Sequence, residues 1–164
     1  MASTYTDNTG IEQPGSGEQA GSWGTTVNRN FAIIDAAVHG QVEKTVTGDF
    51  DLTTTDGAVS DGQHTVIVLT GTPGSTFEMR VTPINQQKYF TVRNETTDGS
   101  ACRVIYKGVT YSTSTGVEIA SGATQAVTGD GTKGGNTSGI FKNLTPPTDL
   151  VNDSSPQLLS LIHI

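Results

Sequence analysis

The residues best able to do chemistry are three histidines, His39, His64 and His163, and a single cysteine, Cys102. A metal site of the common kind needs two or more His or Cys ligands at short fixed spacings, and these residues stand far apart. Cys102 lies in an alternating apolar segment, which is typical of a packed and unreactive thiol. We therefore expect surface or capping histidines, a buried cysteine and no metal centre.

A group of acidic residues raises calcium binding as a second kind of chemistry. Four aspartates lie close together in the sequence: Asp49, Asp51, Asp56 and Asp61. An EF-hand loop that began at Asp49 would need glycine at its sixth position and glutamate at its twelfth, but Thr54 and Ser60 stand there. Aspartates in turns are the better interpretation.

Two further motifs lack the context that their chemistry requires. Residues 15–20 match the loose glycine pattern of dinucleotide sites, yet no strand precedes them, and Glu18 stands where a phosphate would have to bind. No Gly-x-Ser-x-Gly segment marks a serine nucleophile. The sequence predicts no catalytic residue, no cofactor and no enzyme, although a glycan depolymerase with carboxylates on separate loops stays an open alternative.

Composition excludes several classes of function. Among 164 residues, 27 are Thr, 13 are Ser and 20 are Gly, while the net charge is −7. A negative chain without clustered Lys and Arg is a poor binder of nucleic acid. No apolar run approaches the roughly 20 residues of a membrane span, and we expect neither membrane insertion nor a secretory signal. The abundance of Thr and Gly favours short strands joined by tight turns.

One segment, residues 22–40, has the periodicity of a helix. Its apolar residues Val27, Phe31, Ile34 and Val38 follow at intervals of four, three and four, which places them on one stripe. We expect this stripe, widened by Ile33 and Ala37, to anchor the helix on the rest of the fold. The polar residues of the segment are expected to face solvent or another chain: Arg29, Asn30 and Asp35.

The ends of this helix also carry signals. Ser22 is placed to cap the first turn with its hydroxyl, and Gly40 suits a left-handed residue just past the last turn.

The remaining sequence is β-like. Short alternating runs separated by Asp-Gly and Pro-Gly turns recur about every eight to twelve residues, which is typical of a sandwich or barrel. We predict a mainly β fold in which an N-terminal arm and one α-helix precede an antiparallel β-sandwich or barrel-like module. No sequence repeat is visible.

Four regions follow from this organisation: an extended arm over 1–21, an amphipathic helix over 22–40, a β-sandwich module over 41–128, and a glycine-rich linker with a truncated or non-native tail over 129–164. The last five residues, 160–164, resemble the translated sequencing adapter that ends some metagenomic gene fragments. A native final strand is the alternative.

Two stretches carry a resemblance to a known family. Residues 21–35 read G-S-W-G-T-T-V-N-R-N-F-A-I-I-D, which is similar to the G-x-W-G-x-x-V-N-x-N-F-x-x-I-D opening of many bacteriophage tail-fibre and minor tail proteins. Residues 9–14 resemble the arm that precedes this opening. Residues 77–132 resemble the β module of the same proteins, with a departure at Lys107 and Gly108, where an added turn lengthens a strand pair.

The resemblance implies a virion structural protein that is made in the host cytoplasm and becomes part of the phage tail. It further implies a homotrimer that contacts other tail proteins and contributes to host attachment. On this interpretation the assembly interface is the helix stripe with the lone tryptophan: Trp23, Val27, Phe31, Ile34 and Val38.

Two alternatives stay open. Trp23 either anchors a neighbouring subunit, as interface tryptophans often do, or closes the local core against the β module. The whole β module could instead bind glycans of the host surface through exposed aromatic residues, for which Tyr89, Phe90, Tyr106 and Tyr111 are the candidates.

Overall fold

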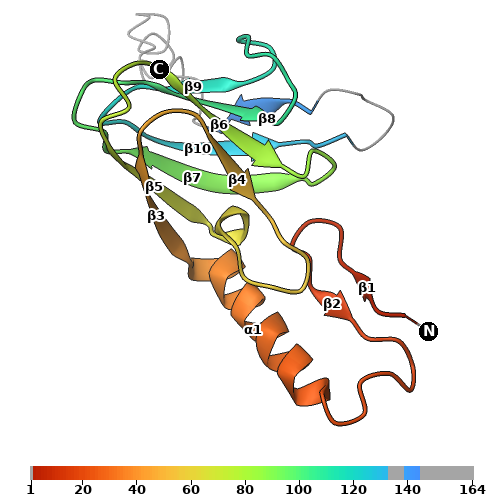
Figure 1. Ribbon diagram of the computed structural model, residues 1–164. Coiled ribbons are helices and arrows are strands. Elements are labelled where there is room, and N and C mark those ends of the chain that lie inside the picture. Colours follow the sequence, from red (N-terminus) through yellow and green to blue (C-terminus); the bar gives the residue numbers. More distant parts are fainter. Residues whose placement is uncertain (1, 133–138, 145–164) are drawn as a thin grey trace, which may run out of the picture.

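The computed structural model of the protein describes residues 2–132 and 139–144. It confirms a mainly β fold with a single helix, as Figure 1 shows: a body of two packed sheets, and the helix α1 (Trp23–His39) projecting from it. A small hairpin of β1 (Thr4–Tyr5) and β2 (Glu12–Gln13) lies beside α1. Within the described residues, no helix is both long and apolar enough to cross a membrane.

The body contains one five-stranded and one four-stranded sheet. The first has the order β11-β10-β7-β5-β3 and consists of β3 (Gln41–Val46), β5 (Val66–Gly71), β7 (Lys88–Asn94), β10 (Thr124–Gly129) and β11 (Phe141–Asn143). The second has the order β4-β6-β8-β9 and consists of β4 (Phe50–Thr53), β6 (Phe77–Thr82), β8 (Cys102–Tyr106) and β9 (Val117–Ile119). A single 3₁₀ turn, η1 (Asp61–Gln63), lies between β4 and β5.

The chain of the body winds back and forth between the two sheets instead of forming hairpins within one sheet. From β3 to β8 the chain alternates between the two sheets, so that β3, β5 and β7 pair in parallel, as do β4, β6 and β8. Gln41 pairs with Val66 and Val66 with Thr91, so each circuit in the five-stranded sheet takes 25 residues. From Phe50 of β4 to its partner Met79 of β6, the circuit takes 29 residues. In the described residues of the two sheets, the antiparallel pairs are β7 with β10, β10 with β11 and β8 with β9.

The expected antiparallel order was therefore wrong for most of the body. The same turn residues are compatible with a hairpin and with a crossing from one sheet to the other. Whether two strands pair parallel or antiparallel depends on contacts 25 or more residues apart. The repeat was also not visible in the sequence, because successive circuits of the chain share an alternation of apolar and polar positions rather than identical residues.

The core lies between the two sheets. Phe77, Met79 and Val81 alternate inward along β6 and meet the inward residues of the other sheet, such as Ile67 and Leu69 of β5. Cys102 is fully buried in this core, and burial raises the pKa of its thiol to about 12. The prediction of a packed, unreactive cysteine is confirmed.

The ends of α1 differ in detail from expectation. Ser22 occupies the N-cap position, but its side chain makes no capping hydrogen bond. Gly40 adopts an extended conformation with φ −71° instead of the expected left-handed one, because the chain passes directly from α1 into β3. A side chain at Gly40 would still be excluded, since its Cβ would lie 2.5 Å from the carbonyl oxygen of Ala36.

The N-terminal arm, expected to be extended and without packing of its own, folds back on the body. Gly57 N donates to the carbonyl of Gly10, whose positive φ of 66° lets the arm pass close to Asp56. Gln63 Nε2 donates to the carbonyl of Thr9 over 2.7 Å. The arm therefore has a fixed position beside both α1 and the body.

The described part of residues 129–164 contains one strand. Phe141–Asn143 forms β11, the edge strand next to β10, and Phe141 is buried in the core. The expectation for residues 160–164 lies outside the described residues.

Candidate functional site

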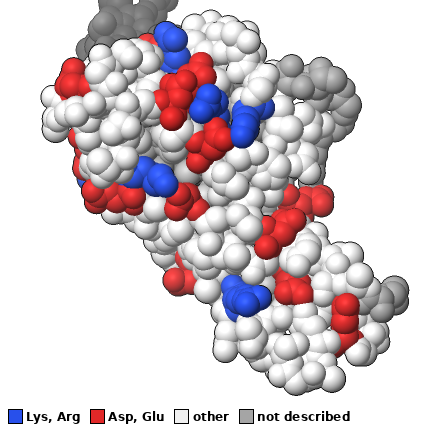
Figure 2. Space-filling view, viewed as in Figure 1, with Lys and Arg blue, Asp and Glu red and all other residues white. Residues whose placement is uncertain are grey.

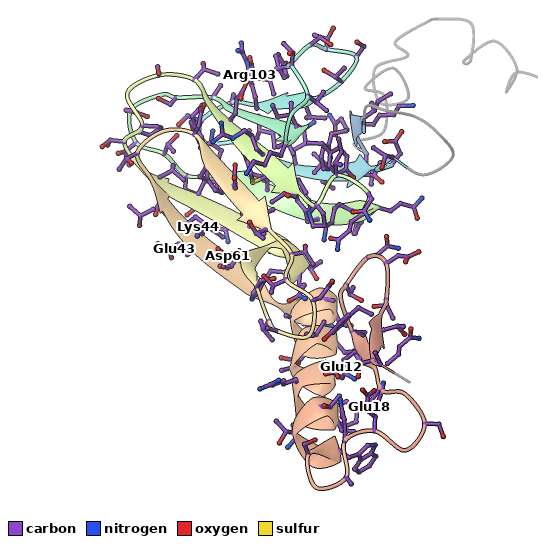
Figure 3. All side chains as sticks on the ribbon, turned by 45° about the vertical axis from the view of Figure 1, so that its right-hand side comes forward. Glu12, Glu18, Glu43, Lys44, Asp61 and Arg103 are labelled. Carbon is purple, nitrogen blue, oxygen red and sulfur yellow. The ribbon has the colours of Figure 1, made fainter. Side chains whose placement is uncertain are left out.

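Helix α1 has one face that packs within its own chain. Its buried residues are Thr26, Ile33 and Ala36. Asn30, expected to face solvent or another chain, instead pairs with the arm in both directions: Glu12 N donates to Asn30 Oδ1 over 3.0 Å, and Asn30 Nδ2 donates to the Glu12 carbonyl over 2.8 Å. The carboxylate of Glu12, labelled beside α1 in Figure 3, also accepts from Thr26 and Gln19.

The predicted apolar stripe is a different face, and it points outward. We define the α1 stripe as Trp23, Val27, Phe31, Ile34 and Val38. Trp23 is 64% exposed, Phe31 63%, Val38 54% and Ile34 42%, and Val27 is half-buried. The expectation that this stripe anchors the helix on the β body was wrong, and so was the interpretation of Trp23 as part of a local core.

The reason for this error is that α1 carries a second apolar face, which is the one that packs within the chain. At 100° per residue, Ile33 lies about 120° and Ala36 about 180° from the centre of the stripe, and both are buried. The large side chains of the stripe itself remain exposed. Such a contiguous apolar surface on a projecting helix is a common mark of a protein interaction site.

The spacing of the stripe matches a coiled-coil seam. The intervals of four, three and four from Val27 to Val38 assign Val27 and Ile34 to d positions and Phe31 and Val38 to a positions of a heptad. At 100° per residue these four side chains and Trp23 span only about 80° of the helix circumference. This width fits a seam between helices better than a broad contact with a sheet.

The two flanks of the stripe differ. One, the arm flank, consists of Thr26, Asn30 and Ile33. Thr26 and Asn30 hydrogen-bond to Glu12 of the hairpin β1–β2, and Ile33 is buried. The other, the open flank, consists of Asn28 and Asp35, both of which are exposed. Asp35 is the only charged residue among these flanking positions, and Figure 2 shows most Lys and Arg atoms on the β body rather than around α1 and the arm.

Asn30 provides a test of how the arm is held. Replacement with alanine removes both hydrogen bonds to Glu12 and leaves a backbone carbonyl and amide without partners, so we expect a loss of about 1–2 kcal/mol in the stability of arm docking. Amide hydrogen exchange at Glu12 should become faster. The matched control is Thr25→Ala, at an exposed position on the side of α1 opposite the stripe, which should leave exchange at Glu12 unchanged. Equal effects of both variants would contradict this account.

The candidate glycan-binding residues do not form a common surface. Tyr106 is fully buried and stacks on Phe141 with ring centroids 4.4 Å apart. Its hydroxyl donates to the carbonyl of Gln86 over 2.7 Å and accepts from Gly131 N over 3.0 Å, and burial raises its pKa. Tyr106 cannot contact a glycan, and its assignment as a binding residue was wrong; Phe90, also fully buried, is excluded in the same way.

The two remaining tyrosines lie at different hollows. Tyr89 is exposed and borders a hollow of about 450 Å³ at the ends of β7 and β10. Tyr111 borders another of about 810 Å³, next to β9 and β11, and its ring packs under the Arg103 guanidinium at 4.4 Å. Neither hollow contains both rings.

Several of the acidic and histidine candidates have structural partners. Asp61 pairs with Lys44 over 2.6 Å, and both are labelled near β3 in Figure 3. Asp51 pairs with Arg80 and Lys107 on the outer face of β4, β6 and β8, and these cations hold the pKa of its carboxyl below the usual value. His64 Nδ1 lies 3.1 Å from the carbonyl of Ser60. Among residues 2–132 and 139–144, no three His, Cys, Asp or Glu side chains gather as a metal site, and His163 falls outside these ranges.

Sequence reasoning missed Lys88. This lysine is 8% exposed, and its Nζ donates to Thr54 Oγ1 at 2.5 Å, to the carbonyl of Gly62 at 3.0 Å and to that of Asn8 at 3.2 Å. Burial lowers its pKa to about 8. The sequence could have indicated this burial, because Lys88 lies on the inward face of β7 together with Phe90 and Val92.

No family model, no curated protein and no solved structure matches this chain. The exposed α1 stripe and its surroundings are therefore the features that indicate function.

Proposed function

We propose that this protein is a structural subunit that assembles with copies of itself through α1, as a component of a bacteriophage tail fibre with a part in host attachment. The observation that carries the self-assembly is the exposed α1 stripe, which has the spacing of a coiled-coil seam and is not covered by residues 2–132 and 139–144 of its own chain. The assignment to a phage tail is supported by the resemblance of residues 21–35 and 77–132 to tail proteins.

The exposed area is large enough to drive association. With about 200 Å² for each aromatic side chain, the exposed fractions of Trp23 and Phe31 correspond to roughly 250 Å² of mostly apolar surface. Covering that area would contribute about 6 kcal/mol per chain to the free energy of association, before the entropy lost on association is subtracted. Val27, Ile34 and Val38 add to this contribution.

A second copy of the chain is a suitable partner for this surface. An apolar seam pairs with an identical seam, and the flanks carry too little charge for identical chains to repel one another. Among the flanking residues, Asp35 alone could pair with a basic partner, and an acidic partner would find no complementary charge. The structural features therefore favour a homo-oligomer over a charged partner protein.

The residue types at the seam favour three chains. Branched Val27 and Ile34 occupy d positions, where leucine would favour a dimer and β-branched residues shift coiled coils to trimers. We therefore propose a homotrimer.

A substitution that places a charge in the seam tests this proposal. Phe31→Asp should convert the trimer to a monomer, because each assembled chain would bury an unpaired carboxylate next to two others, while the isolated fold loses no core contact. Molar mass from light scattering at micromolar concentration measures the change.

The control for this experiment is Ala32→Asp, which introduces the same charge at an exposed position of α1 away from the stripe. It should stay trimeric. A wild-type protein that is monomeric, or a Phe31→Asp variant with the wild-type mass, would refute assembly through α1.

A further inference from the structure

The asymmetry of α1 limits how its copies can pack. The arm flank carries the hairpin β1–β2, which is fixed to Asn30 by two hydrogen bonds and to the body by further contacts of residues 9 and 10. The open flank, Asn28 and Asp35, is exposed, and no other part of the chain that the structure describes covers it. Figure 1 shows the hairpin on one side of α1 only.

Helix direction decides which flanks meet. In the heptad of α1, Asn30 occupies a g position and Asn28 and Asp35 occupy e positions. In a parallel coiled coil, the g side of one helix faces the e side of its neighbour. In an antiparallel pair, g faces g, and two arms would compete for the same space.

We propose that copies of α1 pack parallel and in register, with the arm of each chain lying against the open flank of the next. This inference rests on the proposed self-assembly and specifies its geometry. Each contact then joins two different surfaces, arm flank to open flank, and such contacts close into a ring when the rotation between copies permits it. The β bodies all lie at the same end of the helical stalk.

Cysteines in the seam distinguish the two directions. In a parallel, in-register assembly, residue 27 lies beside residue 27 of the next chain, and residue 38 beside residue 38. In an antiparallel pair, residue 27 lies beside residue 38 instead. We therefore propose the variants Val27→Cys and Val38→Cys, each oxidised with oxidised glutathione, alone and as a mixture prepared by joint refolding.

We expect each variant alone to shift to twice the monomer mass on a non-reducing gel, and the mixture to give no additional cross-link between unlike chains. Ala32→Cys, exposed on the far side of α1, is the matched control and should stay largely at the monomer mass. Wild-type protein controls for Cys102, which is fully buried and should not react.

Light scattering of the reduced samples separates the two proposals. Assembled variants that cross-link only as the mixture would overturn the parallel arrangement and leave assembly through α1 intact. Assembled variants that never cross-link would show that the seam is not the contact, and a monomeric wild-type protein would refute the proposed function itself.

Discussion

Tyr106→Ala is expected to destabilise the protein by about 4 kcal/mol, because it removes a fully buried aromatic ring from the core. The ring stacks on Phe141, and the hydroxyl group joins the carbonyl of Gln86 to the amide of Gly131. The lost side chain would leave a cavity and two backbone groups without their partner. Urea unfolding followed by circular dichroism measures the loss.

Two further variants resolve this effect. Tyr106→Phe keeps the ring and should lose only about 1–2 kcal/mol, from the hydrogen bonds of the hydroxyl. Tyr111→Ala, on the rim of a surface hollow, should change stability by less than about 1 kcal/mol. If Tyr106→Ala unfolded at the wild-type urea concentration, the position of Tyr106 in the core would be contradicted.

The second large effect concerns Lys88 and pH. The folded chain holds the pKa of Lys88 at about 8, below the ordinary value of 10.5, because the amine is buried. Between these two values the unfolded chain binds more protons than the folded one, so the free energy of unfolding should rise with pH. Relative to Lys88→Met, whose methionine cannot titrate, the free energy of unfolding of the wild-type protein should rise by about 2.5 kcal/mol between pH 7 and pH 10.

The comparison with Lys88→Met is needed because Cys102 acts in the opposite direction. Its pKa is raised from 9.0 to about 12, so the unfolded chain binds fewer protons above pH 9 and stability falls there. Both proteins contain Cys102, and its effect cancels in the difference. A difference that stays constant from pH 7 to pH 10 would show that the ammonium group is not desolvated in the folded state.

How much of this structure could be predicted depends on how far apart in the sequence the interacting residues lie. The helix from Trp23 to His39 was predicted within one residue at each end, because its periodicity is a local property. Which face of α1 is covered could not be predicted, since the covering residues, Glu12 and its neighbours, are separated from Asn30 by a loop whose path the sequence does not determine.

The β body shows the same limit. Alternation identified the inward residues of β6, such as Phe77 and Met79, because it depends on neighbouring residues alone. Strand direction depends on pairing between residues as distant as Gln41 and Val66, for which turn residues carry no signal. Tyr106 follows the same alternation as Val104, and this pattern already placed it in the core rather than at a binding surface.

The winding of the body has a consequence for how proteins of this architecture can vary in size. Figure 1 shows β3 nearest to α1, with β5, β7 and β10 successively farther away. Because successive circuits repeat the same parallel pairing, with 25 residues between paired positions from β3 to β7, a whole circuit could be inserted or deleted without breaking the register of its neighbours. The reach of the body beyond its helical stalk would then change in steps of about 4.8 Å, the spacing between adjacent strands.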